Sequence, residues 1–181
     1  RKLMIKTIYI FLYRGGFRKS EIEKLRMIDV EKSQELNIDI RDNRFGRNKT
    51  SSAYRRIPLD CLLLPDERRI ILSYITERTY HKDKRGLFFH DALNIFEPFN
   101  MNELGVYARN IMQNLSEGLY YCLHTFRHTA ISRIQIIDHY RDIGIPEILS
   151  RCIPYNKQQI ETIYSCIFGN NRKLDLYHCL A

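Results

Sequence analysis

The spacing of hydrophobic residues along the chain predicts a mainly helical protein. Residues 3–13 are apolar at nearly every position and are followed by Gly15-Gly16, so we expect a buried helix that the two glycines end. Apolar residues recur with the period of one helix face in three later segments, which are residues 66–80, 102–115 and 157–168.

Residues 35–59 follow a different period, which predicts a small sheet. Apolar and polar residues alternate in Leu-Asn-Ile-Asp-Ile at 36–40, as they do in a half-buried strand. Turn-forming residues follow at 42–46, and residues 54–59 fit a strand that returns. We therefore expect an antiparallel hairpin with a basic loop from Arg44 to Lys49. The fold class is then mainly α with a small antiparallel β-sheet (α+β), in one compact domain over residues 1–181.

Weaker patterns predict several shorter elements. Ser20 is a candidate N-cap for a short helix that runs to about residue 28. The apolar run at 87–89 predicts a short strand. Short helices are expected at 146–151 and in the tail from 174 to 180.

The composition describes a globular protein that binds a polyanion. The 181 residues are enough for one domain with a sizeable core, and 44% of them are hydrophobic. The formal net charge is +8, which points to nucleic acid as the first choice of partner and to an anionic membrane surface as the second. No apolar run approaches the roughly 18 residues of a membrane span, so we expect no membrane insertion.

The cysteines argue against a zinc site and against a disulfide framework. There are five of them, an odd number, and no two form a C-x-x-C pair. Reduced thiols in a cytoplasmic protein are the simpler interpretation. We expect no metal and no cofactor, and a cytoplasmic protein that associates with DNA.

The stretch from Leu123 to Ala130 concentrates the candidate chemistry. His124 and Arg127 are three residues apart, so on a helical turn they project from one face. Arginine presents a fixed fork of donors to a phosphate, and histidine exchanges protons near neutral pH. By itself, the pair is equally well explained as the start of a basic helix on a basic protein.

Three other positions can complete a phosphate site. Arg18 lies between a glycine turn and a helix start, where exposed backbone donors attract anions, and Glu21 is placed to orient it. Lys49 stands on the basic loop, where a lysine acts as a mobile charge and proton donor. Tyr164 becomes a usable nucleophile only if nearby cations stabilise its phenolate. Each of the three, taken alone, is more simply a surface or packing residue.

Together these residues resemble the catalytic domain of the tyrosine recombinase (phage integrase) family, from Leu12 to about Phe168. The family's first box is similar to residues 12–22, Leu-Tyr-Arg-Gly-Gly-Phe-Arg-Lys-Ser-Glu-Ile, which puts its catalytic arginine at Arg18. Its hairpin lysine is similar to Lys49-Thr50 ahead of Arg-Ile-Pro-Leu at 56–59. Its His-x-x-Arg box is similar to His-Thr-Phe-Arg at 124–127.

The C-terminal part of the resemblance contains one departure. Tyr164 stands near the place expected for the family's nucleophile. Shortly before that tyrosine the family usually has a histidine or a tryptophan, and here Arg151 occupies the position. Arginine can still donate a hydrogen bond to a phosphate oxygen, but it cannot exchange a proton.

The resemblance implies metal-free cutting and rejoining of double-stranded DNA. Two arginines would clamp the scissile phosphate while a tyrosine attacks it, which leaves a 3′-phosphotyrosyl enzyme and a free 5′-hydroxyl. The implied roles are clamping by Arg18 and Arg127, attack by Tyr164, help with the tyrosine proton by His124, protonation of the 5′-oxygen by Lys49, and support of the phosphorane by Arg151.

The resemblance also implies an assembly on DNA. Further basic residues would contact DNA phosphates without reading sequence, namely Arg44, Arg47, Arg55, Arg56 and Lys82. The family acts as a tetramer on DNA and passes a C-terminal segment between neighbours, for which residues 174–180 are a candidate. The family's N-terminal DNA-clamping domain is absent from this chain, so we expect either a fragment of a longer protein or one that has lost that part.

Two alternatives stay open. The first is a degenerate DNA-binding module of the same fold that has lost cleavage, as Arg151 and the missing domain suggest. The second is a helical RNA-binding or adaptor protein whose basic surface is merely electrostatic.

Overall fold

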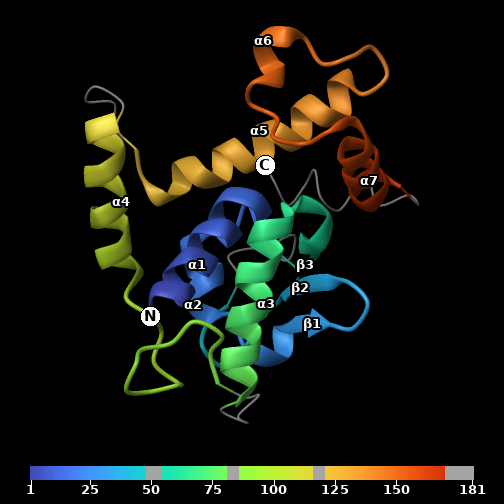
Figure 1. Cartoon of the computed structure of the whole chain (residues 1–181). Coiled ribbons are helices and arrows are strands. Elements are labelled where there is room, and N and C mark those ends of the chain that lie inside the picture. The colour runs from blue at the N-terminus through green and yellow to red at the C-terminus, as the bar shows by residue number, and fades with distance from the viewer. Residues whose placement is uncertain (48–53, 81–85, 116–120, 170–181) are drawn as a thin grey trace.

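The computed structural model describes residues 1–47, 54–80, 86–115 and 121–169. In these ranges the chain is mainly helical and carries a three-stranded antiparallel sheet (Figure 1), which confirms the predicted α+β class. The α-helices are α1 (Lys2–Gly15), α2 (Lys19–Lys24), α3 (Pro65–Tyr80), α4 (Met101–Leu115), α5 (Leu123–Tyr140), α6 (Glu147–Ser150) and α7 (Lys157–Phe168). Two short 3-10 helices are η1 (Met27–Asp29) and η3 (Leu59–Leu62).

Helix α1 lies in the hydrophobic core, as its apolar sequence predicted. It packs against α3, α5 and η3. The fully buried ring of Phe11 meets the rings of Phe17, Phe88 and Phe89 at centroid distances of 5.0, 5.8 and 5.3 Å. The helix ends at the predicted glycine pair, where Gly16 adopts the left-handed conformation with φ of 62°.

The sheet confirms the predicted hairpin and adds a strand to it. Its order is β1 (Val30–Lys32), β2 (Leu36–Ile40) and β3 (Arg55–Pro58), and both pairs are antiparallel. In the central strand β2, Ile38 lies opposite Val30 on one side and Ile57 on the other. Burial alternates along β2 as the sequence predicted. Strand β1 was not predicted, because three residues are too few to display a period.

The predicted start of the helix after α1 is wrong by two residues. Helix α2 begins at Lys19, so Ser20 lies inside it, and Arg18 occupies the cap position. The carboxylate of Glu21 accepts a hydrogen bond from the backbone N–H of Arg18 at 2.7 Å. The backbone donor at the start of the helix is therefore satisfied by a glutamate in the first turn, and Ser20 is not the cap.

Helix α2 is also shorter than predicted, and the strand expected at residues 87–89 does not form. Leu25 turns to an extended conformation, and its carbonyl accepts a hydrogen bond from the N–H of Phe88 at 2.6 Å. Leu87 pairs with Arg26 only through an isolated bridge. Both errors have one cause, because two segments far apart in the sequence pair here and local periodicity cannot show it.

The other helices occur where the sequence placed them. Helices α3, α4 and α7 begin within one residue of their predicted starts, and α6 lies inside the predicted segment 146–151. Among the described residues, no helix combines the length and the apolar character that crossing a bilayer requires. The predicted tail helix at 174–180 lies outside the described ranges.

Replacing Phe11 with alanine should lower the free energy of unfolding by about 3–5 kcal/mol, because the cavity would open among three aromatic rings. Urea unfolding followed by circular dichroism measures the loss. Leu93, whose side chain is 96% exposed, provides the control, and Leu93→Ala should change the same quantity by less than about 0.5 kcal/mol. Equal losses from the two variants would contradict the central position of α1.

Candidate phosphate-binding site

The C-terminal end of α1 packs against the first half of α5, and this contact brings two candidate arginines together. The guanidinium of Arg127 donates a hydrogen bond to the carbonyl of Gly16, the residue that ends α1. A Cβ added to Gly16 would lie 3.4 Å from the Cβ of Ala130, so the two backbones approach closely. Arg18 follows Gly16 by two residues, and the helix contact therefore fixes Arg18 near Arg127.

Glu21 holds Arg18 in place from inside the protein. Besides the backbone N–H of Arg18, its carboxylate accepts a hydrogen bond from Nη1 of Arg18 at 3.2 Å. The same carboxylate forms a two-bond ion pair with Arg55, whose Nη1 and Nη2 each donate at 2.8 Å. The side chains of Glu21 and Arg55 are each 2% exposed, whereas that of Arg18 is 39% exposed. The predicted contact between Glu21 and Arg18 is therefore present, with an unexpected third partner.

The surroundings of Glu21 keep its carboxylate ionised. Burial by itself raises the pKa of Glu21, but the hydrogen bonds and charge of Arg55 act in the opposite direction. The backbone N–H of Arg18 and the charge of Arg127 add to this effect, and the pKa is lowered in the balance. At neutral pH a negative charge consequently lies on the interior side of Arg18 and Arg127, the two arginines of the candidate phosphate clamp.

His124 belongs to the same site. Desolvation lowers the pKa of His124, and the positive charges of His128, Arg127 and Arg18 lower it further. Its ring meets that of His128 edge to face with centroids 4.4 Å apart, and both histidines are exposed on α5. A neutral imidazole at pH 7 can accept a proton. The sequence interpretation gave His128 no role, although its spacing of four residues from His124 predicts this contact.

These side chains make a site suited to a phosphate. Both guanidinium groups are forked, permanently charged donors: the side chain of Arg18 is 39% exposed, whereas Arg127 is buried and uses Nη1 on Gly16. The imidazole beside them can bind an oxygen or exchange a proton. His124 also lies in the first turn of an 18-residue helix, whose positive end favours an anion. The structure therefore gathers Arg18, His124 and Arg127, three of the residues that the sequence selected.

Tyr164 does not lie with Arg18, His124 and Arg127. Its ring lies 4.1 Å from the guanidinium carbon of Arg141, which caps the C-terminal end of α5, whereas Arg127 lies near the start of that helix. Figure 1 shows α7 beside the C-terminal end of α5. The two arginines are 14 residues apart (141 − 127), which corresponds to about 21 Å along a helix. Arg141 also donates a hydrogen bond to Glu161 at 3.0 Å, one turn before Tyr164 on α7. The candidate nucleophile is therefore held away from the candidate clamp.

Arg151 caps the end of α6 and is exposed. The residue after it is anchored, because the carbonyl of Cys152 accepts a hydrogen bond from Nε of Arg133 at 3.0 Å. Arg133 is buried on α5 and also donates to the carbonyl and the hydroxyl of Tyr13. Arg151 is thus tied indirectly to the end of α1. Lys49, the predicted proton donor, lies outside the described residues.

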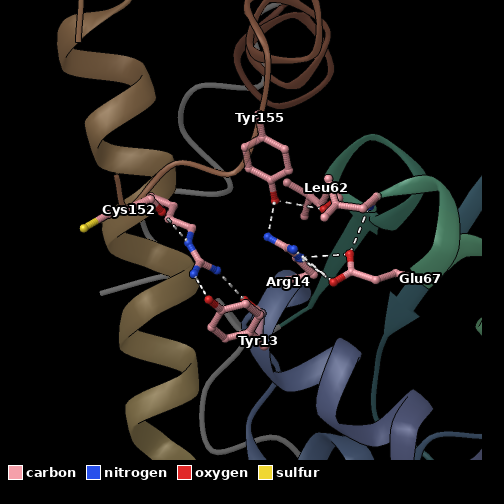
Figure 2. A network of polar contacts seen from close by, with 8 residues as sticks. Tyr13, Arg14, Leu62, Glu67, Cys152 and Tyr155 are labelled. Carbon is pink, nitrogen blue, oxygen red and sulfur yellow. Dashed lines mark hydrogen bonds and ion pairs between the residues drawn. The ribbon is translucent and has the colours of Figure 1, made fainter. Parts of the chain in front are cut away.

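A second buried arginine fixes the segment that leads into α7 (Figure 2). Arg14 donates to both carboxylate oxygens of Glu67 at 2.9–3.0 Å and to the hydroxyl of Tyr155 at 3.5 Å. Tyr155 in turn donates to the carbonyl of Leu62 at 2.9 Å. No pattern in the sequence separates Arg14 and Arg133 from the surface arginines, because their partners are distant along the chain.

The residues predicted to line DNA have different surroundings. Arg44 and Arg47 are exposed, and the guanidinium of Arg44 lies over the rings of Phe45 and Phe96 at 4.8 and 4.9 Å. Arg56 is 46% exposed and forms ion pairs with Glu31 and Asp39. Lys82 lies outside the described residues.

Arg55 requires a correction. The sequence placed it among the surface residues that contact DNA, but it is buried in the ion pair with Glu21. Neighbouring residues on a strand point to opposite faces, so Arg56 faces solvent while Arg55 faces the interior.

Comparison with known proteins adds nothing to this picture: no family model matches the chain, and a search of curated proteins found no match. A functional assignment therefore depends on the residues and on their geometry.

The NMR titration midpoint of His124 should lie below its ordinary value of 6.5, because desolvation and the neighbouring side chains of His128, Arg127 and Arg18 disfavour the imidazolium. In Arg18→Gln the midpoint should rise toward that value, since one of the cations is removed. Arg69→Gln, which removes an exposed arginine on α3, should leave it unchanged. An unchanged midpoint in Arg18→Gln would contradict the convergence of Arg18 on His124.

Proposed function

We propose that this chain is the catalytic domain of a tyrosine recombinase-type enzyme that cuts and rejoins double-stranded DNA without a metal. The observation that carries the proposal is the convergence of Arg18, at the cap of α2, with His124 and Arg127 on α5. These are the residues that the family resemblance marks as the phosphate clamp, and the chain that carries them has a net charge of +8. In this proposal the protein acts in the cytoplasm, on DNA, as a tetramer.

The proposed reaction is an in-line displacement at one DNA phosphate. The phenolic oxygen of Tyr164 bonds to phosphorus while the bond from phosphorus to the 5′-oxygen breaks. The phosphotyrosyl ester that results conserves the energy of the broken bond, so the 5′-hydroxyl can later attack it and reseal the strand. Arg18 and Arg127 neutralise the charge that builds on the nonbridging oxygens. His124 accepts the phenolic proton, and Lys49 supplies a proton to the departing 5′-oxygen. Arg151 donates a further hydrogen bond to the phosphorane.

This reaction requires α7 to change its position when DNA binds. Tyr164 lies against Arg141, about 21 Å along α5 from Arg127, so the contacts of Arg141 must break before attack. The side chains of Arg141 and Glu161 are 31% and 48% exposed, and at such partly exposed positions an ion pair and a cation–π contact are weak. DNA that binds the active arrangement better can therefore shift the equilibrium.

A second candidate function is DNA binding without cleavage. The separation of Tyr164 from Arg127 favours it, and so does an arginine at position 151. In this case the clamp would hold a DNA phosphate with no nucleophile to attack it. The two candidates differ in one respect that can be measured, which is the formation of a covalent protein–DNA adduct.

The wild-type protein should form a covalent adduct with duplexes that carry a nick next to a randomised sequence. Cleavage near the nick releases a short strand with the free 5′-hydroxyl, and without that strand the protein–DNA bond cannot be resealed. Tyr164→Phe should form none, whereas Tyr155→Phe should retain it. Denaturing electrophoresis detects the adduct, and peptide mass spectrometry locates the modified residue. No adduct in any condition would favour the binding module, and an adduct lost only in Tyr155→Phe would move the nucleophile to that residue.

Arg141→Gln should increase the rate of adduct formation several-fold, because it removes both contacts that hold Tyr164 and Glu161 at the end of α5. Single-turnover kinetics at saturating DNA measures this rate. Arg69→Gln removes the same charge from an exposed position on α3 and should leave the rate unchanged. A rate that falls in Arg141→Gln would mean that Arg141 supports the active arrangement instead of opposing it.

A further inference from the structure

The buried ion pair between Arg55 and Glu21 connects the sheet to the candidate clamp. Arg55 lies on β3 and Glu21 on α2, 34 residues apart in sequence. Both oxygens of the carboxylate accept from the guanidinium, one from Nη1 and the other from Nη2, at 2.8 Å. This forked geometry restricts the carboxylate to one orientation.

Each oxygen of the oriented carboxylate also holds Arg18. Oε2 of Glu21 accepts the backbone N–H of Arg18 at 2.7 Å, and Oε1 accepts Nη1 of Arg18 at 3.2 Å. The first bond fixes where α2 starts, and the second fixes one arm of the guanidinium. The position of Arg18 is therefore set by Glu21, and the position of Glu21 is set by Arg55.

Arg55 also changes the electrostatics of the clamp. Glu21 is ionised and close to both Arg18 and Arg127. Without a third cation, this carboxylate would cancel much of the charge of one clamp arginine and would repel a phosphate brought between them. The guanidinium of Arg55 balances the carboxylate from the interior side, so the outward face of the site keeps a positive excess.

We infer that Arg55 is a positioning residue of the phosphate site, which acts through Glu21 on Arg18 and does not itself touch DNA. The inference rests on the proposed function of Arg18, His124 and Arg127. It replaces the expectation, drawn from the sequence, that Arg55 is one of several interchangeable phosphate contacts on the surface.

The test uses the double variant E21Q/R55Q, which leaves the net charge unchanged and removes both halves of the ion pair. The amide pair avoids a buried carboxylate that has lost its two-bond partner, which Arg55→Gln alone would create. Arg55→Lys is the second variant, because it keeps the charge but loses the fork. Arg69→Gln serves as a control with an exposed arginine, and thermal melting establishes that each variant is folded.

Two quantities are measured on nicked duplex DNA, which are the affinity as a function of salt and the rate of adduct formation at saturating DNA. We expect E21Q/R55Q to keep the affinity and the salt slope of the wild type but to lose about tenfold to a hundredfold in rate. The rate of Arg55→Lys should lie between those of the wild type and of E21Q/R55Q, and its salt slope should equal that of the wild type. Arg69→Gln should retain the wild-type rate.

The outcomes that overturn the inference are distinct from failure of the proposed function. A salt slope that falls by about one in E21Q/R55Q with an unchanged rate would make Arg55 an ordinary phosphate contact. A wild-type rate in both Arg55 variants would mean that Arg18 needs no support from the sheet. No adduct from the wild-type protein would overturn the proposed function itself, and the inference with it. If E21Q/R55Q does not fold, the rate and slope of Arg55→Lys decide between the first two outcomes.

Discussion

The ionised carboxylate of Glu21 is the point on which the candidate site depends. A buried carboxylate is costly unless cations and hydrogen bonds surround it, and Glu21 is bound by Arg55 and Arg18, with Arg127 close enough to lower its pKa. These partners come from β3, from the start of α2 and from α5. One negative charge thereby links the sheet, the turn after α1 and the helix that carries the histidines. The same charge holds the arginines around it in fixed positions, which distinguishes them from the mobile arginines of an ordinary basic surface.

The second requirement is the close approach of two helices. Gly16 ends α1 in a left-handed conformation and lies against Ala130, and its carbonyl receives Arg127. A side chain at this position would be strained by the conformation and crowded by α5. The first arginine of the site follows two residues later. The glycine turn therefore determines both where α1 stops and how far Arg18 lies from α5.

Much of the fold could be predicted from the sequence, because long segments with a clear period bury one face. Helices α3 and α7 are of this kind, and so is the short strand β2. The failures were short elements: β1 has too few residues to display a period, and the limits of α2 and of the run at 87–89 depend on pairing between segments far apart in the sequence. The convergence of Arg18, His124 and Arg127 was expected from the resemblance, and the structure places them together.

The surroundings of single arginines could not be predicted. Arg55 and Arg56 are adjacent in the sequence, but one is buried in an ion pair and the other faces solvent. Arg14 and Arg133 hold the segment before α7 through Tyr155 and Cys152, which follow them by 141 and 19 residues in the chain. The contact between Tyr164 and Arg141 could not be predicted either, because it results from packing between α5 and α7 and no sequence motif marks it.

The most direct test of the central claim is a crystal structure of the Tyr164→Phe protein bound to duplex DNA. In this structure one backbone phosphate should accept hydrogen bonds from Arg18, Arg127 and His124, while Arg55 stays on Glu21 beneath them. DNA bound along another face, with these three side chains far from any phosphate, would contradict it.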